Sequence, residues 1–139
     1  MFFYDRYIRF SETDGAGVVY FSQVLNLCHE SYEESLRMAG LDLQYFFCSR
    51  KLAIPIVHAT ADFFRPLHCG DRVRIGVVAQ RSQGSEFEIT YQLYLNPSSI
   101  DRSVAQAKTR HVCIDPQTRQ RIDCPPLLDP WFLLVQDAE

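Results

Sequence analysis

Residues 13–40 read TDGAGVVYFSQVLNLCHESYEESLRMAG, and they are the most informative part of the sequence because they pass from a loop into one long helix. Its first part holds an aspartate and two glycines, which are typical of a turn. Beyond Ser22, apolar side chains recur every four residues, at Val24, Cys28, Tyr32 and Leu36. This spacing predicts an amphipathic helix with Ser22 as its N-cap and Gly40 as its C-terminal stop.

Strand-like segments lie on both sides of this helix. Residues 2–10 alternate with a period of two and predict one strand, which a loop over 11–17 follows. After a less regular stretch at 41–52, further strands are expected at about 53–64, 71–81, 86–96 and 104–114. Residues 81–84 and 97–99 supply turns between them. The proline-rich tail from Asp115 is expected to wrap the surface irregularly.

The order of strand, long helix and four strands indicates an α+β fold with a largely antiparallel sheet, because helices do not alternate with the later strands. The 139 residues fit one domain. The later strands are apolar on more faces than one helix can cover. We therefore expect a homo-oligomer, a dimer or a tetramer, that buries sheet or edge surface.

Composition excludes several classes of protein. Seventeen Asp and Glu against fourteen Lys and Arg give a net charge of −3, which argues against a dedicated nucleic-acid binder. Membrane insertion is not expected, because no uncharged run approaches the roughly 18–20 apolar residues that span a bilayer. Charges within residues 1–10 argue against a signal peptide. Five cysteines without C-x-x-C spacing indicate reduced, mostly buried thiols in a cytoplasmic protein.

Asp14 is the first candidate for chemistry, because it lies beside glycines just before the helix. Glycine lets another molecule approach the backbone, and a helix start presents unpaired N–H groups at the positive end of its dipole. A carboxylate near such donors suits acyl transfer, in which one group attacks or activates water and others stabilise the oxyanion. The alternative is that Asp14 only caps the turn or the helix.

His29, Glu30 and Glu33 form an H-E-x-x-E sequence on the helix. His29 and Glu33 share a face, but the second histidine of a zinc-binding H-E-x-x-H motif is absent, so a polar helix flank is favoured over a metal site. We expect no metal and no organic cofactor. Glu30 remains a candidate general base.

His58 is either a core histidine or a polar contact for a ligand on the sheet. Alternation along residues 54–64 places it on one face with Ile54, Ile56, Thr60 and Asp62. Basic residues also follow the strands, and most are expected on a solvated face: Arg65, Arg72, Arg74, Arg81, Arg102, Lys108 and Arg110. The absence of nucleotide-binding glycine loops and of a G-x-S-x-G elbow argues against dinucleotide enzymes and serine α/β-hydrolases.

Residues 13–21, TDGAGVVYF, resemble the loop-to-helix motif of hot-dog-fold acyl-CoA thioesterases of the 4-hydroxybenzoyl-CoA thioesterase type. The order of elements agrees, and residues 62–71, DFFRPLHCGD, resemble the strand, proline turn and Gly-Asp entry of that family. Residues 28–33, 57–59 and 111–114 are most similar to its 1,4-dihydroxy-2-naphthoyl-CoA hydrolases of phylloquinone biosynthesis. The resemblance covers about residues 3–114.

The resemblance implies a five-stranded antiparallel sheet wrapped around the helix, and hydrolysis of 1,4-dihydroxy-2-naphthoyl-CoA to 1,4-dihydroxy-2-naphthoate and CoA. It implies that Asp14 is the catalytic residue, as nucleophile or as general base toward water. The backbone N–H of Phe21 would polarise the thioester carbonyl, with Gly17 and Tyr20 nearby. It also implies active sites at dimer interfaces, while no basic cluster maps onto the CoA phosphate contacts.

Other functions remain open. Within the family, a short- or medium-chain acyl-CoA or acyl-carrier thioesterase is the nearest alternative. A hot-dog dehydratase would rely on His58 and Glu30, which are also candidate substrate contacts for a thioesterase. A non-catalytic hot-dog subunit would bind CoA esters without turnover.

Overall fold

A computed structural model of the chain describes residues 1–95 and 103–137. Its strands are β1 (Phe2–Tyr7), β2 (Ile56–Phe63), β3 (Arg72–Gln83), β4 (Glu86–Leu95) and β5 (Ser103–Val112). Its helices are η1 (Phe10–Glu12), α1 (Phe21–Met38), α2 (Leu43–Cys48), η2 (Pro126–Leu128) and α3 (Asp129–Val135). The turn expected at 97–99, Asn96 and Arg102 lie outside the described residues.

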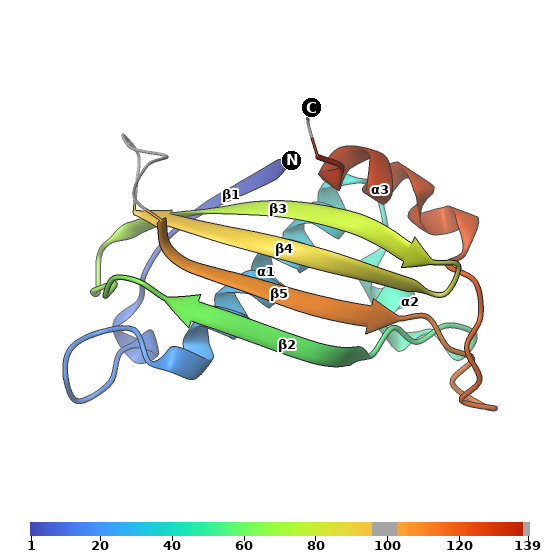
Figure 1. The fold of residues 1–139 in the computed structure, drawn as a ribbon, viewed down its shortest axis with the longest axis horizontal. Coiled ribbons are helices and arrows are strands. Elements are labelled where there is room, and N and C mark those ends of the chain that lie inside the picture. The colour runs from blue at the N-terminus through green and yellow to red at the C-terminus, as the bar shows by residue number, and fades with distance from the viewer. Residues whose placement is uncertain (96–102, 138–139) are drawn as a thin grey trace.

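The five strands form one antiparallel sheet in the order β1-β3-β4-β5-β2 (Figure 1). This arrangement confirms the α+β class and the antiparallel sheet that the sequence predicts. The strand expected over residues 2–10 ends earlier, because Ile8 leaves the ladder to exchange backbone hydrogen bonds with Gly70 and Asp71. The turn expected at 81–84 begins later, since β3 continues through Gln83.

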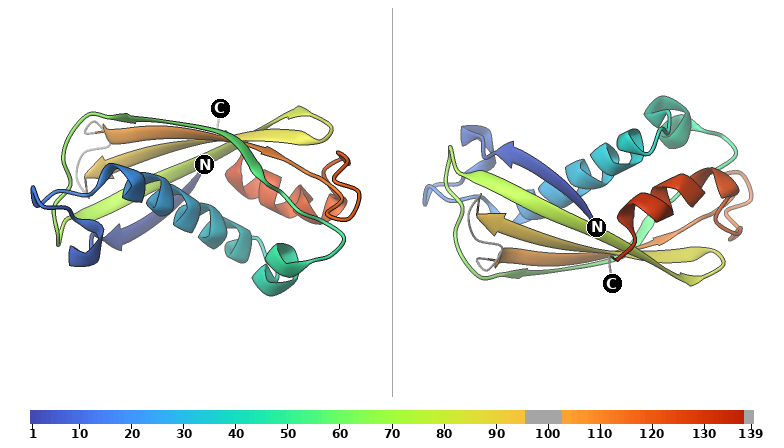
Figure 2. Two further views of the ribbon diagram at one scale, coloured as in Figure 1. Left: turned by 90° about the horizontal axis from the view of Figure 1, so that it is seen from below. Right: turned by 90° about the horizontal axis from the view of Figure 1, so that it is seen from above.

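Helix α1 packs across one face of the sheet, and α3 lies on the same face (Figure 2). The four apolar positions that the sequence picks out on α1 are all buried: Val24, Cys28, Tyr32 and Leu36. The predicted N-cap is wrong. The helix begins at Phe21 with Tyr20 as N-cap, no side chain caps it, and Ser22 lies inside its first turn. Gly40 follows the helix with a φ of +90°, which suits the predicted stop.

The C-terminal tail is more ordered than the sequence suggests. It forms α3, whose Trp131 and Val135 are fully buried under the sheet. The Trp131 indole N–H donates a 2.8 Å hydrogen bond to Ser35 Oγ on α1. The stretch at 41–52 likewise contains a short helix, α2, which Asp42 caps by accepting from the amides of Gln44 and Tyr45. Both elements follow from contacts with the core that local sequence patterns do not reveal.

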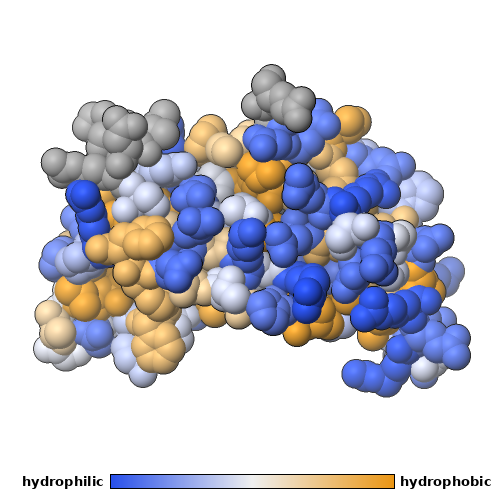
Figure 3. Space-filling model, viewed as in Figure 1, coloured by the Kyte–Doolittle hydropathy of each residue, from blue (hydrophilic) through white to orange (hydrophobic). Residues whose placement is uncertain are grey.

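The outer face of the sheet is polar, contrary to the expectation that the later strands are apolar on too many faces. Figure 3 shows this face with hydrophilic side chains over its centre. Lys108 on β5 lies 3.6 Å from Glu88 on β4, and Arg74 on β3 pairs with Asp5 on β1 at 2.8 Å. Uncovered apolar surface lies instead at the edge strand β2, where Val57 and Phe63 are each 51% exposed.

Two further expectations are tested by the fold. Cys28 and Cys113 are buried and Cys124 is partly buried, in line with the expected burial of most thiols, whereas Cys48 and Cys69 are exposed. Among the helices of residues 1–95 and 103–137, none is long and apolar enough to cross a membrane.

Candidate active site

The loop before α1 forms a tight turn around Asp14. The amide of Gly17 donates to the Asp14 carbonyl at 2.9 Å, and Gly17 adopts a φ of +80°, a conformation that glycine reaches without strain. The amide of Ala16 donates to Asp14 Oδ1 at 2.8 Å. Within the described part of the chain, Oδ2 has no hydrogen-bond partner. The turn therefore orients the carboxylate and leaves one oxygen available for chemistry.

The same loop is anchored to residues from distant parts of the chain. Its base is closed by a bridge between Thr13 and Val19, and the Asp14 amide donates to the Val18 carbonyl at 2.9 Å. The Val19 amide donates to the carbonyl of Leu67, beyond the end of β2, at 2.8 Å. These backbone hydrogen bonds hold Asp14 in position relative to the segment that joins β2 to β3.

The start of α1 lies beside this loop with unpaired donors. The Tyr20 amide donates to the Glu12 carbonyl at 3.0 Å, while the amide of Phe21 has neither a side-chain nor a backbone acceptor among the described residues. Such amides lie at the positive end of the helix dipole. The arrangement can stabilise an oxyanion that develops next to Asp14.

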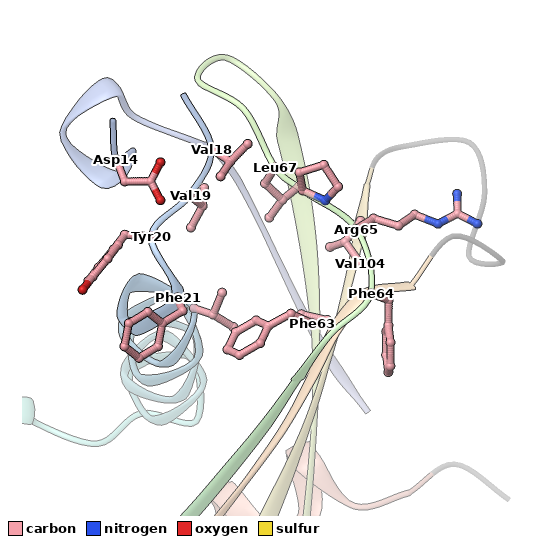
Figure 4. A pocket seen from close by; sticks show the side chains of 13 residues that line it. Asp14, Val18, Val19, Tyr20, Phe21, Phe63, Phe64, Arg65, Leu67 and Val104 are labelled. Atoms are coloured by element: carbon pink, nitrogen blue, oxygen red, sulfur yellow. The ribbon is translucent and has the colours of Figure 1, made fainter. Parts of the chain in front are cut away.

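Asp14 and the helix start line a cavity of about 480 Å³ between α1 and the end of β2. Phe63 from β2 extends toward the start of α1, where Phe21 also lines the cavity (Figure 4). The remaining lining is largely apolar: Val18, Val19, Val24, Phe64, Leu67, Val104 and Ala105, with Tyr20, Arg65 and Pro66. A cavity of this size with one carboxylate and aromatic walls suits a small apolar or aromatic group.

Residues 8–132 of the chain match the sequence profile of the Thioesterase-like superfamily. The chain belongs to this superfamily. It is 50% identical over 138 residues to a 1,4-dihydroxy-2-naphthoyl-CoA hydrolase of Rippkaea orientalis, covering 98% of each chain. It is 48% identical over 134 residues to the enzyme of that name from Crocosphaera subtropica, covering 96% of this chain and 97% of the relative.

Solved structures agree with the thioesterase assignment. The crystal structure of a 1,4-dihydroxy-2-naphthoyl-CoA thioesterase from Synechocystis superposes with a TM-score of 0.88 at 36% identity, covering 95% of each chain. The fold is therefore the hot-dog thioesterase fold, and the α+β architecture predicted from the sequence is confirmed.

The two remaining site candidates, Glu30 and His58, lie away from the Asp14 cavity. Glu30 lies on α1 opposite β1, where its oxygens accept from Arg6 at 3.0 and 3.2 Å and from the Tyr4 hydroxyl at 3.0 Å. Burial and this contact with Glu30 raise the pKa of Tyr4. His58 is opposite Arg110 on the outer face of the sheet, with Thr60 and Asp62 on the same side. Neither Glu30 nor His58 lines the cavity with Asp14.

A β-bulge explains why His58 does not share a face with Ile56. The register of β2 against β5 shifts between these two residues, so Ile56 pairs with the buried His111 and His58 pairs with Arg110. Strict alternation from Ile56 therefore fails, because a bulge adds one residue and reverses the facing of those beyond it. The predicted common face of His58 with Thr60 and Asp62 is confirmed.

His29 and Glu33 meet as the helical spacing predicts. Their Nδ1 and Oε1 atoms are 3.1 Å apart, and both side chains are close to half exposed. In the described ranges, no cluster of three or more His, Cys, Asp or Glu side chains could hold a metal ion.

Several cavity residues are not identified as functional by the sequence alone. Phe63, Phe64 and Arg65 lie in the 62–71 segment that carries the family resemblance, and Val104 comes from β5. The sequence of residues 62–71 indicates the family, but only the fold shows that these residues lie against the Asp14 loop. Arg65 is the one cation among the residues lining the cavity, and its guanidinium points away from Asp14 (Figure 4).

Arg6 connects β1, α1 and the loop that leads to Asp14. Its guanidinium contacts Glu30 and also pairs with Glu12, whose own carboxylate accepts from the Arg9 amide at 2.8 Å. The side chains of Arg6 and Glu12 are only 10% and 12% exposed. Because the Glu12 carbonyl also accepts from the Tyr20 amide, Arg6 supports the start of α1.

Replacing Arg6 by methionine is expected to destabilise the protein and to lower turnover. The variant leaves the Glu12 carboxylate buried without its cation, so the free energy of unfolding should fall by about 2–3 kcal/mol in urea titrations. Arg37→Met is the matched control, because Arg37 makes an exposed pair with Glu34 on the same helix and should change stability far less. Equal stability losses in the two variants would contradict a supporting role for Arg6.

Proposed function

We propose that this chain hydrolyses 1,4-dihydroxy-2-naphthoyl-CoA to 1,4-dihydroxy-2-naphthoate and CoA. The family resemblance implies that this reaction is a step of phylloquinone biosynthesis. The observation that carries the proposal is the Asp14 carboxylate beside the uncapped start of α1, in a cavity with aromatic walls. Near full-length relatives that carry this activity in their names support the choice of substrate. We also propose a cytoplasmic location, because the cysteine pattern lacks a disulfide framework.

In the proposed reaction, Asp14 acts on the thioester carbonyl carbon. Either its carboxylate attacks that carbon directly, or it takes a proton from a water molecule that attacks. In both routes the carbonyl oxygen becomes negatively charged, and the N–H of Phe21 at the start of α1 stabilises it, with Gly17 and Tyr20 beside it. The C–S bond then breaks, and CoA leaves as a thiolate that takes up a proton released from the attacking water. In the direct route the acyl group remains on Asp14 as a mixed anhydride, which water hydrolyses to give the free acid and the Asp14 carboxylate.

The cavity also supports an aromatic acyl group. The rings of Phe21 and Phe63 offer offset or edge contacts, each worth about 0.5–1.5 kcal/mol beyond the area that they bury. The hydroxyl groups of a naphthoyl ring require hydrogen-bond partners once buried, since an unpaired one costs about 1–3 kcal/mol.

The function is tested by following release of the CoA thiol with an Ellman-type reagent across a panel of acyl-CoA esters. We expect the dihydroxynaphthoyl ester to exceed short- and medium-chain esters in kcat/KM by roughly 100-fold. A better aliphatic substrate would overturn the naphthoyl assignment and leave the thioesterase assignment intact. Binding without thiol release from any ester would favour the non-catalytic subunit.

We propose that the active species is a homo-oligomer built on the edge strand β2. This strand has one free edge in the sheet order, and Ile56, Val57 and Phe63 on it are 42%, 51% and 51% exposed. An exposed apolar edge is protected when two copies pair through it about a two-fold axis. Such pairing would also place a second chain close to the Phe63 side of the cavity.

The oligomer is tested by light scattering at micromolar concentration. We expect a mass of at least twice the 16.1 kDa of one chain, and we expect Val57→Lys to shift it toward the monomer. Leu133→Lys is the control, because Leu133 is 68% exposed on α3, away from β2. A fully active monomer would contradict the proposal.

Substrate contacts by His58 and Glu30 stay predictions. His58 can reach an acyl group only from outside the Asp14 cavity, so a contact would require the substrate or a second copy to cross the outer face of β2. If His58 binds a substrate hydroxyl, His58→Ala raises KM for a hydroxylated aromatic thioester more than for its unhydroxylated analogue. Equal KM values for wild type and variant on both substrates would identify His58 as a surface residue.

A further inference from the structure

Two cysteines from separate segments lie side by side at the end of β5. Cys113 follows β5, and Cys124 belongs to the segment that leads to α3. Their Sγ atoms are 3.2 Å apart, and Cys113 donates a hydrogen bond to Cys124. The thioesterase chemistry proposed above uses neither thiol, since neither lines the cavity with Asp14.

Backbone hydrogen bonds hold this pair in place independently of the thiols. The Cys113 amide donates to the Ser85 carbonyl and the Cys124 amide to the adjacent Gly84 carbonyl, each at 2.8 Å. The Ile122 amide donates to the Cys113 carbonyl at 3.0 Å. The turn between β3 and β4 therefore holds the backbone of both cysteines, and the sulfur atoms have to approach from 3.2 Å to the roughly 2.05 Å of a disulfide.

The two thiols differ in exposure and in pKa, and this difference suits disulfide formation. Cys124 is partly exposed, whereas Cys113 is fully buried. The hydrogen bond from Cys113, together with the nearby charge of Arg81, lowers the pKa of Cys124. The same hydrogen bond and burial raise the pKa of Cys113. Cys124 is thus the more accessible thiol and the more readily deprotonated one, and Cys113 is the neighbouring thiol that can react with it once it is oxidised.

We propose that Cys113 and Cys124 form a reversible oxidation site, at which a peroxide converts the pair to an intramolecular disulfide. The Cys124 thiolate attacks one peroxide oxygen, the O–O bond breaks, and the sulfur becomes a sulfenic acid as hydroxide leaves. The Cys113 sulfur then attacks that sulfur, an S–S bond forms, and the S–O bond breaks to release water with the Cys113 proton. Two thiols are oxidised, hydrogen peroxide is reduced to two waters, and a dithiol reductant reverses the change.

The disulfide would tie the C-terminal segment to the sheet. It closes a loop over residues 113–124 and lies just before α3, whose Trp131 packs under the sheet. The remaining thiols lack such a partner. Cys28 is buried, with a pKa raised to about 12 by burial, and Cys48 and Cys69 are exposed without a neighbouring cysteine among the described residues.

The test uses a Cys48→Ser/Cys69→Ser background, which leaves Cys28, Cys113 and Cys124 as the three thiols of the chain. After treatment with hydrogen peroxide, removal of the oxidant and unfolding, we expect one titratable thiol to remain, a mass lower by two hydrogens, and a peptide map that links Cys113 to Cys124. A dithiol reductant should restore all three thiols. The oxidised form should melt roughly 5–10 °C higher, because the cross-link restricts the unfolded chain.

The matched variant adds Cys124→Ser to the same background and should form no internal disulfide under the same treatment. Retention of all three thiols by the background protein would overturn the proposal. So would oxidation of Cys124 to sulfinic acid without a link to Cys113, or a link that joins Cys28 to either partner. None of these outcomes depends on thioesterase activity, so the proposal stands or falls separately from the function.

Discussion

Asp14→Asn is expected to lower kcat for the thioester by at least roughly 1,000-fold while the protein remains folded. The substitution keeps the size of the side chain and its carbonyl oxygen, which can still accept from the Ala16 amide. It removes the charge with which Asp14 attacks the carbonyl carbon or takes a proton from water. A loss of this size corresponds to about 4 kcal/mol of transition-state stabilisation.

Asp42→Asn is the matched control for this variant. Asp42 also accepts from backbone amides through Oδ1, at the N-cap of α2, but it lies outside the Asp14 cavity. The melting temperatures of the two variants should agree within a few degrees, and only Asp14→Asn should lose turnover. If Asp14→Asn retains more than roughly a tenth of the wild-type kcat, a loss below about 1.4 kcal/mol, then Asp14 is not the catalytic group.

Trp131→Ala should lower the free energy of unfolding by about 3–5 kcal/mol, as large-to-small substitutions of buried aromatic residues do. The Trp131 side chain is fully buried, and its ring centroid lies 5.6 Å from that of Tyr32 and 5.2 Å from that of Phe87. The substitution leaves a cavity between α3, α1 and the sheet. It also removes the hydrogen bond that Ser35 Oγ accepts.

Urea titration of Trp131→Ala should be compared with Leu133→Ala on the same helix. Leu133 is 68% exposed, so its truncation should change the free energy of unfolding by less than about 0.5 kcal/mol. Because the two positions share a helix, the difference isolates burial from helix propensity. Similar small losses in both variants would show that α3 contributes little to the core.

The site could be predicted from the sequence only in part. Asp14, Gly17, Tyr20 and Phe21 lie close together in the chain, so their meeting at the start of α1 follows from local order. Phe63 and Val104 are far from them in sequence and join the cavity only because β2 and β5 pair and lie against α1. Long-range neighbours of this kind leave no local pattern.

His58 shows how a local rule fails within a strand that is otherwise predicted well. The alternation of β2 predicts a common face with Ile56, but one extra residue at the bulge reverses the facing. Glu30 shows the same limit on a helix. Its position on α1 follows from the period of 3.6, whereas its contacts with Arg6 and Tyr4 depend on where β1 joins the sheet.

The class of fold, the order of the elements, the buried stripe of α1 and the family can all be read from the amino-acid sequence, because they depend on periodicity and on motifs that are contiguous in the chain. Three features depend on long-range packing and emerge only from the folded chain: the tail forms a helix under the sheet, Arg6 supports the loop of Asp14, and Cys113 lies against Cys124. A seven-residue helix such as α3 is too short to be stable alone, so burial of Trp131 and not local propensity holds it in place.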